Sequence, residues 1–253
     1  MIIIKNEQEQ DGMRRAGRVA ARVLDEVARQ VRPGITTAEL DAFGAGRIAH
    51  HGGRSAFLGY RKYPCHLCIS VNEEVVHGIA SERRLQFGDL VSLDVGVHFR
   101  GFIGDNARTV CVGGCSPEQQ RLMDVTEQSL HEAIGQAVPG NRVADISRAV
   151  QKYVERAGYS VVREFVGHGV GRSMHEEPQV PNYIDGKRSP RLKAGMTLAI
   201  EPMVNAGLAG VRVLSDNWTV VTEDGLPSAH FEHTVLVTGG APEILTCLDE
   251  VLC

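Results

Sequence analysis

The sequence predicts an α+β protein in which two related halves contribute strands that meet in the middle. Three observations carry this prediction: helix patterns in both halves, a repeated order of elements, and the alternating stretch VSLDVGVHFRGFIGDNARTV at residues 91–110. We assign residues 1–253 to one domain, with its halves at approximately 10–115 and 116–245.

Each half begins with a helix pattern. From Met13 to Val31, apolar residues recur at helical spacing and stop at the turn sequence RPG. A second long helix is predicted to begin at SPEQ, because Ser116 can cap it, Pro117 suits its first position and Gln119 completes a capping box. This helix ends at VPG.

The order of elements repeats at a fixed distance. Pro139-Gly140 follows Pro33-Gly34 by 106 residues, and Gly158 follows Gly52 by the same distance. A duplication whose copies are related by a pseudo-twofold axis would leave such a pattern. A site between the halves would then draw residues from both.

Composition limits the possible functions. The chain of 253 residues is 43% hydrophobic and 23% charged, as expected for a globular protein with a substantial core. Its formal net charge of −4 indicates no direct binding of nucleic acid. We expect no membrane contact and a cytoplasmic location, because no apolar stretch has the length of a signal segment or membrane span. The low cysteine content suits a reducing compartment.

Two aspartates interrupt the strands predicted at residues 91–110. Asp94 and Asp105 stand on the polar side of the alternation, and a two-residue turn at Phe99-Arg100 would place them directly opposite each other. Like charges in that position destabilise a sheet. A shared proton, an arginine or a metal ion must therefore compensate them.

The second half adds three polar groups in apolar surroundings. His168 lies between Gly167 and Gly169, which would let the backbone crowd a ligand, while Glu201 ends one apolar strand and Glu232 begins another. Each residue alone is more often an exposed loop or strand-end residue. Four buried carboxylates and one imidazole together would be strongly destabilising without two divalent cations.

The ligand chemistry narrows the choice of metal. Oxygen-rich ligation with one histidine and no thiolate favours Mn, Fe, Co, Mg or a catalytic Zn. Five protein ligands on two metals would leave open positions for water, and such water is a hydrolytic nucleophile. A structural zinc site made of Cys65, Cys68, Cys111 and Cys115 is less favoured than buried or pocket-lining thiols.

The motifs around these residues resemble the type I methionine aminopeptidases. They are SLDVGV, GDNART, GHGVGRSMHEEP, IEPMV and FEHT, together with CISVNEEVVHGIA around His77, and the likeness runs from RRAGRVAARVL to EHTVLVT. The resemblance implies the pita-bread fold, with two pseudo-twofold-related halves around a central antiparallel sheet. It also implies metal-dependent hydrolysis of the N-terminal methionine of nascent proteins and peptides, with a small second residue preferred and a water or hydroxide bridging two metals as nucleophile.

The resemblance further implies a role for each site residue. Asp94 would bind one metal, His168 and Glu201 the other, and Asp105 and Glu232 both. His77 would lie near the scissile nitrogen, and His175 would stabilise the tetrahedral intermediate. Glu201 would also carry a proton to the departing amine.

The side-chain pocket departs from the family pattern at two positions. Tyr60, Tyr63, Cys68 and Trp218 coincide with residues that line the family's methionine pocket. Phe57, however, stands where bacterial relatives commonly have cysteine, and Met174 replaces the usual phenylalanine before His175. These changes would shift turnover or side-chain preference without abolishing hydrolysis.

Two alternatives stay open at this point. One is a proline-type aminopeptidase or prolidase, which shares the five ligands; the other is a non-enzymatic peptide-binding module on the same fold. The expected partners are nascent polypeptide N-termini and possibly the ribosome, and the resemblance implies a monomer.

Overall fold

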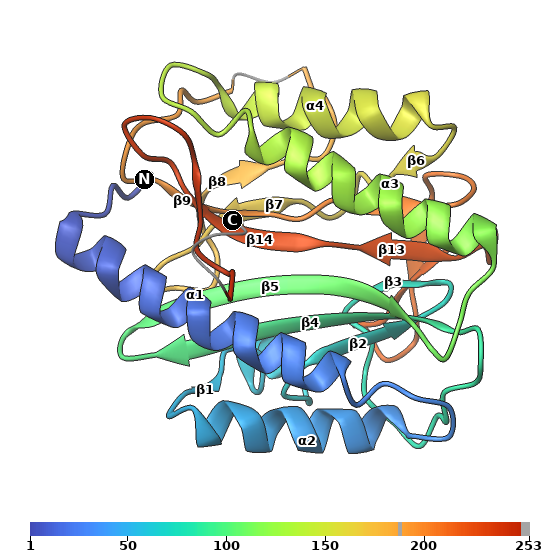
Figure 1. Cartoon of the computed structure of the whole chain (residues 1–253). Coiled ribbons are helices and arrows are strands. Elements are labelled where there is room, and N and C mark those ends of the chain that lie inside the picture. Colours follow the sequence, from blue (N-terminus) through green and yellow to red (C-terminus); the bar gives the residue numbers. More distant parts are fainter. Residues whose placement is uncertain (187–188, 249–253) are drawn as a thin grey trace.

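The computed structural model describes residues 1–186 and 189–248, in which two runs of elements each begin with a pair of helices (Figure 1). The helices are α1 (Glu7–Ala28), α2 (Thr37–His50), α3 (Pro117–Ile134) and α4 (Val143–Arg156), with a short 3₁₀ turn η1 (Tyr60–Lys62). The strands are β1 (Arg54–Ser55), β2 (Cys68–Val71), β3 (Glu74–Val76), β4 (Leu90–Phe99), β5 (Phe102–Cys111), β6 (Ser160–Val161), β7 (Gly167–Gly169), β8 (Glu176–Val180), β9 (Thr197–Ile200), β10 (Met203–Asn205), β11 (Val211–Val213), β12 (Val220–Thr222), β13 (Ser228–His230), β14 (Glu232–Leu236) and β15 (Glu243–Ile244).

Capping residues set the starts of the long helices. Helix α3 begins where the sequence predicts, with the Ser116 hydroxyl accepting the Gln119 N–H. Helix α1 begins earlier than the predicted Met13, because Asn6 and Glu9 form a capping box ahead of the buried face. It also ends before Val31, whose N–H donates to the Ala28 carbonyl in a tighter turn.

The repeat predicted from the sequence appears in the helices. The limits of α4 lie 106 residues beyond those of α2, since Val143 follows Thr37 and Arg156 follows His50 at that distance. The turns before both helices contain a glycine with positive φ, at +90° for Gly34 and +95° for Gly140. This backbone conformation favours glycine at both positions.

The two halves join in one antiparallel sheet, which confirms the predicted fold class. Among the described residues, the nine-stranded sheet runs in the order β1-β4-β5-β14-β9-β7-β8, with β2 paired to β4 and β15 to β14. Strand β5 from the first half and β14 from the second lie side by side at its centre (Figure 1).

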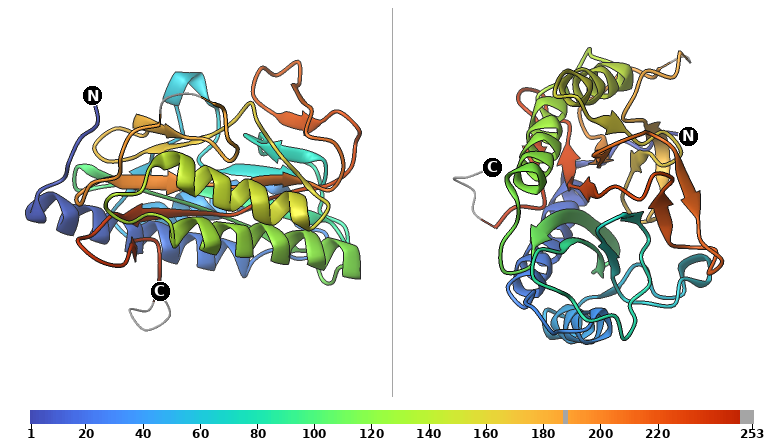
Figure 2. Two further views of the ribbon diagram at one scale, coloured as in Figure 1. Left: turned by 90° about the horizontal axis from the view of Figure 1, so that it is seen from above. Right: turned by 90° about the vertical axis from the view of Figure 1, so that its right-hand side faces the viewer.

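The helices cover one face of this sheet and leave the other for the site. Figure 2 shows them in an arc along one side, with the strands inside it. A Cβ at Gly104 of β5 would lie 2.5 Å from the Ala16 carbonyl oxygen of α1, so this face of β5 packs against the helix. The neighbouring Asp105 therefore points away from the helices, because successive side chains of a strand alternate. No helix in the described part of the chain could cross a membrane.

Candidate active site

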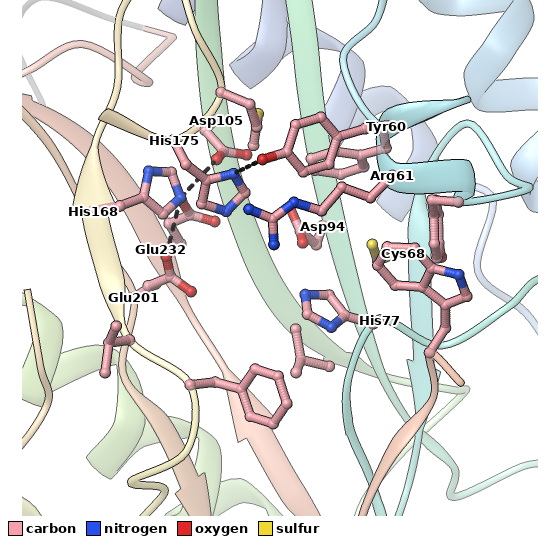
Figure 3. Close-up of a pocket in the computed structure, with 17 residues that line it drawn as sticks. Tyr60, Arg61, Cys68, His77, Asp94, Asp105, His168, His175, Glu201 and Glu232 are labelled. Carbon is pink, nitrogen blue, oxygen red and sulfur yellow. Dashed lines mark hydrogen bonds and ion pairs between the residues drawn. The ribbon is translucent and has the colours of Figure 1, made fainter. Parts of the chain in front are cut away.

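Five polar residues converge on one pocket from five adjacent positions in the sheet (Figure 3). Asp94 lies on β4, Asp105 on β5, Glu232 on β14 and His168 on β7, and Glu201 directly follows β9. The order of these strands in the sheet is β4-β5-β14-β9-β7. Asp105 and Glu232 therefore occupy the two central strands, where the halves meet.

The two aspartates are diagonal neighbours, so the predicted pairing of Asp94 with Asp105 is wrong. Asp94 pairs with Ala107, and Asp105 pairs with Gly96. The turn is Arg100-Gly101, one residue later than predicted, and both residues have positive φ. Glycine suits the second position of such a turn, whereas a turn at Phe99-Arg100 would lack it. The shift of one residue in each strand keeps both carboxylates on the same face.

A threonine holds Asp105 at the junction of the halves. Strands β5 and β14 pair directly at two positions, Glu232 with Ala107 and His233 with Asn106. Beyond these pairs, the Thr234 hydroxyl accepts the Asp105 N–H at 3.1 Å and donates to the Asp105 carbonyl at 2.7 Å. The hydroxyl thus continues the strand contact and fixes the backbone of Asp105 relative to Glu232.

The carboxylate cluster is buried, and its hydrogen bonds to the described protein residues are incomplete. Asp105 and Glu232 are each 2% exposed, and Asp94 is 8% exposed. One oxygen of each of the three is buried without a hydrogen-bond partner. Burial raises the pKa of Asp94 to about 7 and holds the pKa values of Asp105, Glu201 and Glu232 well above their usual range, with their mutual repulsion adding to the effect.

His168 faces these carboxylates as a neutral ring. Its Nδ1 lies 2.9 Å from the Gly169 carbonyl oxygen, and its Nε2 lies 3.4 Å from Glu201 Oε1 and 3.7 Å from Asp105 Oδ2. Burial lowers the pKa of His168 to about 3. Donation of the Nδ1 proton to the carbonyl would leave the lone pair of Nε2 directed at the cluster.

These residues fit a divalent metal site. Ligand atoms of Asp105, His168 and Glu232 all lie within 4.8 Å of one another, with Asp94 and Glu201 lining the same pocket. The unpartnered oxygens and the neutral imidazole nitrogen are donors that a cation would satisfy. Carboxylates with one imidazole suit the hard and borderline metals rather than a thiolate site.

A tyrosine orients the second histidine of the pocket. The Tyr60 hydroxyl lies 2.8 Å from His175 Nδ1, and the two rings stack with centroids 5.3 Å apart. His175 in turn lies beside His168, with ring centroids 4.2 Å apart. The predicted pair His168 and His175 is therefore in contact at the edge of the cluster.

The opposite wall contains His77 between aromatic rings. The His77 ring makes edge contacts with Phe165 and Trp218 at centroid distances of 5.4 and 5.9 Å. Its backbone has a φ of +61°, a left-handed conformation that non-glycine residues rarely adopt outside constrained sites. Burial lowers the pKa of His77 to about 4, so the ring is neutral at pH 7. Tyr63 and Cys68 line the same pocket.

Phe57 and Met174 both line the pocket and are nearly buried. A Cβ at Gly96 would lie 2.5 Å from the Phe57 ring, which therefore packs directly on β4 opposite the position of Asp105. The Phe57 ring also meets the Tyr63 ring edge-on at 6.5 Å.

The glycines beside His168 serve strand packing. A Cβ at Gly167 would lie 2.4 Å from the Ala199 carbonyl oxygen, and one at Gly169 would lie 2.4 Å from the Glu177 carbonyl oxygen. Glycine at both positions therefore permits the close approach of β7 to the strands on both sides.

The sequence prediction missed several pocket residues: Arg61, Val76, Phe165 and Val166 line the pocket, and His230 places its Nε2 3.9 Å from Glu201 Oε2. His230 could have been noticed two residues before Glu232 in SAHFEHT. Nothing in the sequence around Arg61 indicates a place in the pocket, because arginine is common in exposed loops. Only the folded loop brings it beside the carboxylates.

Comparison with known proteins finds a family match over most of the chain. The sequence profile of metallopeptidase family M24 matches residues 11–239. A methionine aminopeptidase of Clostridium perfringens is 50% identical over 248 residues, which cover 98% of this chain and 100% of that protein.

Solved structures show the same fold. The methionine aminopeptidase of Thermotoga maritima has a TM-score of 0.95 and 44% identity, with 97% of this chain and 99% of that one covered. A prolidase from Pyrococcus furiosus has a TM-score of 0.81 and 24% identity, and it covers 98% of this chain and 66% of its own. The prolidase likeness is evidence of a shared fold alone.

Proposed function

Because this chain belongs to metallopeptidase family M24, we propose that it removes the N-terminal methionine from nascent proteins and peptides whose second residue is small. One observation carries the proposal. The buried cluster of carboxylates with His168 opens into the same pocket that Tyr63, Cys68 and Trp218 line. A cluster that can hold hard cations thus adjoins a wall suited to a sulfur-containing apolar side chain.

We propose that the cluster holds two divalent metal ions, for which Co, Mn, Fe, Zn and Mg are the candidates. Asp94 would bind one ion, His168 and Glu201 the other, and the centrally placed Asp105 and Glu232 both. When bound, the ions would supply Lewis-acid polarisation of the scissile carbonyl and of the attacking water.

The remaining groups are placed for binding and proton transfer. If the Tyr60 hydroxyl donates to His175 Nδ1, the proton of His175 resides on Nε2 and can be donated to the carbonyl oxygen as negative charge develops on it. Glu201 would accept the proton of the attacking water and pass it to the departing amine. His77, neutral and fixed by its aromatic neighbours, would contact the scissile nitrogen.

The substrate class supports further proposals about the setting. We propose that residues 1–253 act as one catalytic domain, as a monomer in the cytoplasm, and that the substrates are met at or near the ribosome.

The test is release of free amino acid from Met-Ala-Ser, Leu-Ala-Ser and Ala-Pro-Ala peptides by metal-free protein titrated separately with each candidate metal. Metal-dependent release of methionine alone is the expected result. Cleavage before proline would instead favour the prolidase alternative. Peptide binding without hydrolysis under every metal would favour the non-enzymatic module.

A further inference from the structure

We propose that Arg61 forms a subsite for an acidic side chain at the third residue of the peptide. This inference rests on the proposed function and extends it to a class of preferred substrates. It starts from a cation that lies in the pocket but outside the predicted site.

Arg61 lies at the wall of the pocket between Tyr60 and the carboxylate cluster (Figure 3). Its guanidinium carbon lies 5.4 Å from the centroid of the Tyr60 ring. Within the described residues, no carboxylate forms an ion pair with it. The side chain is also exposed, so a substrate can reach it. Arg61 is therefore a cation available to a ligand.

The backbone holds Arg61 in a conformation that arginine rarely adopts. Arg61 has a φ of +48° and Lys62 a φ of +75°, which places two successive non-glycine residues in the left-handed region. Such strain persists where the surrounding structure imposes it, and it concentrates at binding and catalytic sites.

The surroundings do impose this conformation. The Tyr63 N–H donates to the Tyr60 carbonyl, and the Gly59 N–H donates to the Tyr63 carbonyl. The buried Tyr63 hydroxyl lies 2.7 Å from the Gly78 carbonyl oxygen, and Tyr60 is held by His175. The backbone of Arg61 is thus held between two anchored tyrosines.

The alternation of an extended peptide selects the residue that would meet Arg61. Side chains one and three of an extended chain point to the same side, and their positions are about 7 Å apart along it. The first side chain enters the pocket walled by Phe57, Tyr60 and Tyr63 in the proposed function. The third would therefore return toward this same segment, at the point where Arg61 lies, while the small second residue points away.

Charge then determines the preferred third residue. With cations in the cluster, the carboxylates are compensated, and Arg61 is left as a cation at the pocket wall. A planar guanidinium is well suited to pair with a carboxylate, so aspartate or glutamate should be favoured and lysine disfavoured.

The experiment compares kcat/KM for amidated Met-Ala-Glu, Met-Ala-Gln and Met-Ala-Lys peptides with the metal-loaded protein. Glutamine matches the shape of glutamate without its charge, and amidation removes the terminal carboxylate. We expect the glutamate peptide to be preferred to the glutamine peptide by about two- to five-fold, mainly through KM, and the preference to fall with added salt.

Substitutions of the loop locate the effect. Arg61→Gln should bring the glutamate-to-glutamine ratio close to one, and Arg61→Glu should favour the lysine peptide. Lys62 also has positive φ but does not line the pocket. Lys62→Gln, which removes this neighbouring charge, should therefore retain the preference for the glutamate peptide.

The outcomes separate the two proposals. Equal values for the glutamate and glutamine peptides in the unmodified protein, or a ratio that Arg61→Gln leaves unchanged, would overturn the subsite. Failure to release methionine from any of the three peptides would overturn the proposed function. In that case, calorimetry would compare the affinities of the glutamate and glutamine peptides for the protein. Equal affinities would refute the subsite.

Discussion

Glu232 and Asp105 differ from the other carboxylates in lying on the two strands that join the halves. Each has a buried oxygen without a protein hydrogen-bond partner, and each is 2% exposed. A side chain on these central strands can reach an ion on the Asp94 side and an ion on the Glu201 side. Asp94 and Glu201 lie on opposite flanks, and each is close to one side only. This central position is the reason for proposing that Glu232 and Asp105 would contact both ions.

Glu232→Gln tests this assignment. The substitution keeps the shape of the side chain but removes its charge. Loss of a hydrogen-bond partner of a metal ligand lowers metal affinity by roughly 10–100-fold, and loss of the ligand itself should lower it further. Turnover should be lost together with the metal. Elemental analysis after dialysis checks the metal content. His175→Gln is the control, because it should retain metal while lowering kcat by about 10²–10³-fold. Full metal content in Glu232→Gln would refute the shared role.

Phe57 is a predicted pocket residue whose packing the structure shows in detail. Its ring fills the space above Gly96 and contacts Tyr63. Phe57→Cys should enlarge the pocket and lower the discrimination between methionine, leucine and norleucine, by up to about ten-fold per methylene. Tripeptides that differ only in the first residue measure this ratio. An unchanged ratio would show that Phe57 does not contact the first side chain.

At the scale of elements, the chain before α1 holds the loop that carries Met174 and His175. Lys5 Nζ lies 2.7 Å from Glu176 Oε2, and both side chains are nearly buried. The other oxygen of Glu176 accepts the N–H groups of Arg172 and Ser173. A Cβ at Gly171 would meet this oxygen at 2.4 Å, so the loop closes tightly around the carboxylate.

Lys5→Met should destabilise the protein by about 3–5 kcal/mol, because it leaves Glu176 buried without its cation. The double variant Lys5→Met with Glu176→Gln removes both charges and should recover most of this loss. Urea unfolding measures both changes, and kcat with the Met-Ala-Ser peptide reports the position of His175. Equal stability of Lys5→Met and the unmodified protein would mean that the pair does not anchor the loop.

At the scale of the whole molecule, the carboxylate cluster lies where the two halves meet. Direct strand pairing there is short, and the Thr234 hydroxyl supplies the adjoining contacts. The repulsion among buried carboxylates opposes this junction. Cations bound between the halves would convert the repulsion into attraction and so stabilise the fold.

Metal removal should therefore lower the melting temperature. A ligand at 100 times its dissociation constant stabilises a protein by about 2.7 kcal/mol, which corresponds to roughly 5–10 °C for a chain of this size. Calorimetry with and without a chelator measures the shift. The Glu232→Gln variant should melt at nearly the same temperature in both conditions. An equal chelator response in that variant would show that the stabilising metal binds elsewhere.

Local patterns were sufficient for the start of α3 and for the repeat, and they placed Asp94 and Asp105 on one face of their strands. Ser116 and Gln119 act through contacts within one turn, and the alternation around Asp94 and Asp105 needs only the period of a strand. These features depend on neighbours in the chain, and sequence spacing is enough to predict them.

Tertiary contacts decided most of the rest. The strand register was a local feature that the prediction missed, because it depends on the positive φ of Arg100-Gly101. Gly167 and Gly169, in contrast, lie against strands that only the fold places beside them. Arg61 enters the pocket because two distant partners, His175 and the Gly78 carbonyl, anchor the tyrosines on either side of it. These contacts join residues that are far apart in the chain. Sequence spacing does not reveal them, because their distances are set only when the chain packs.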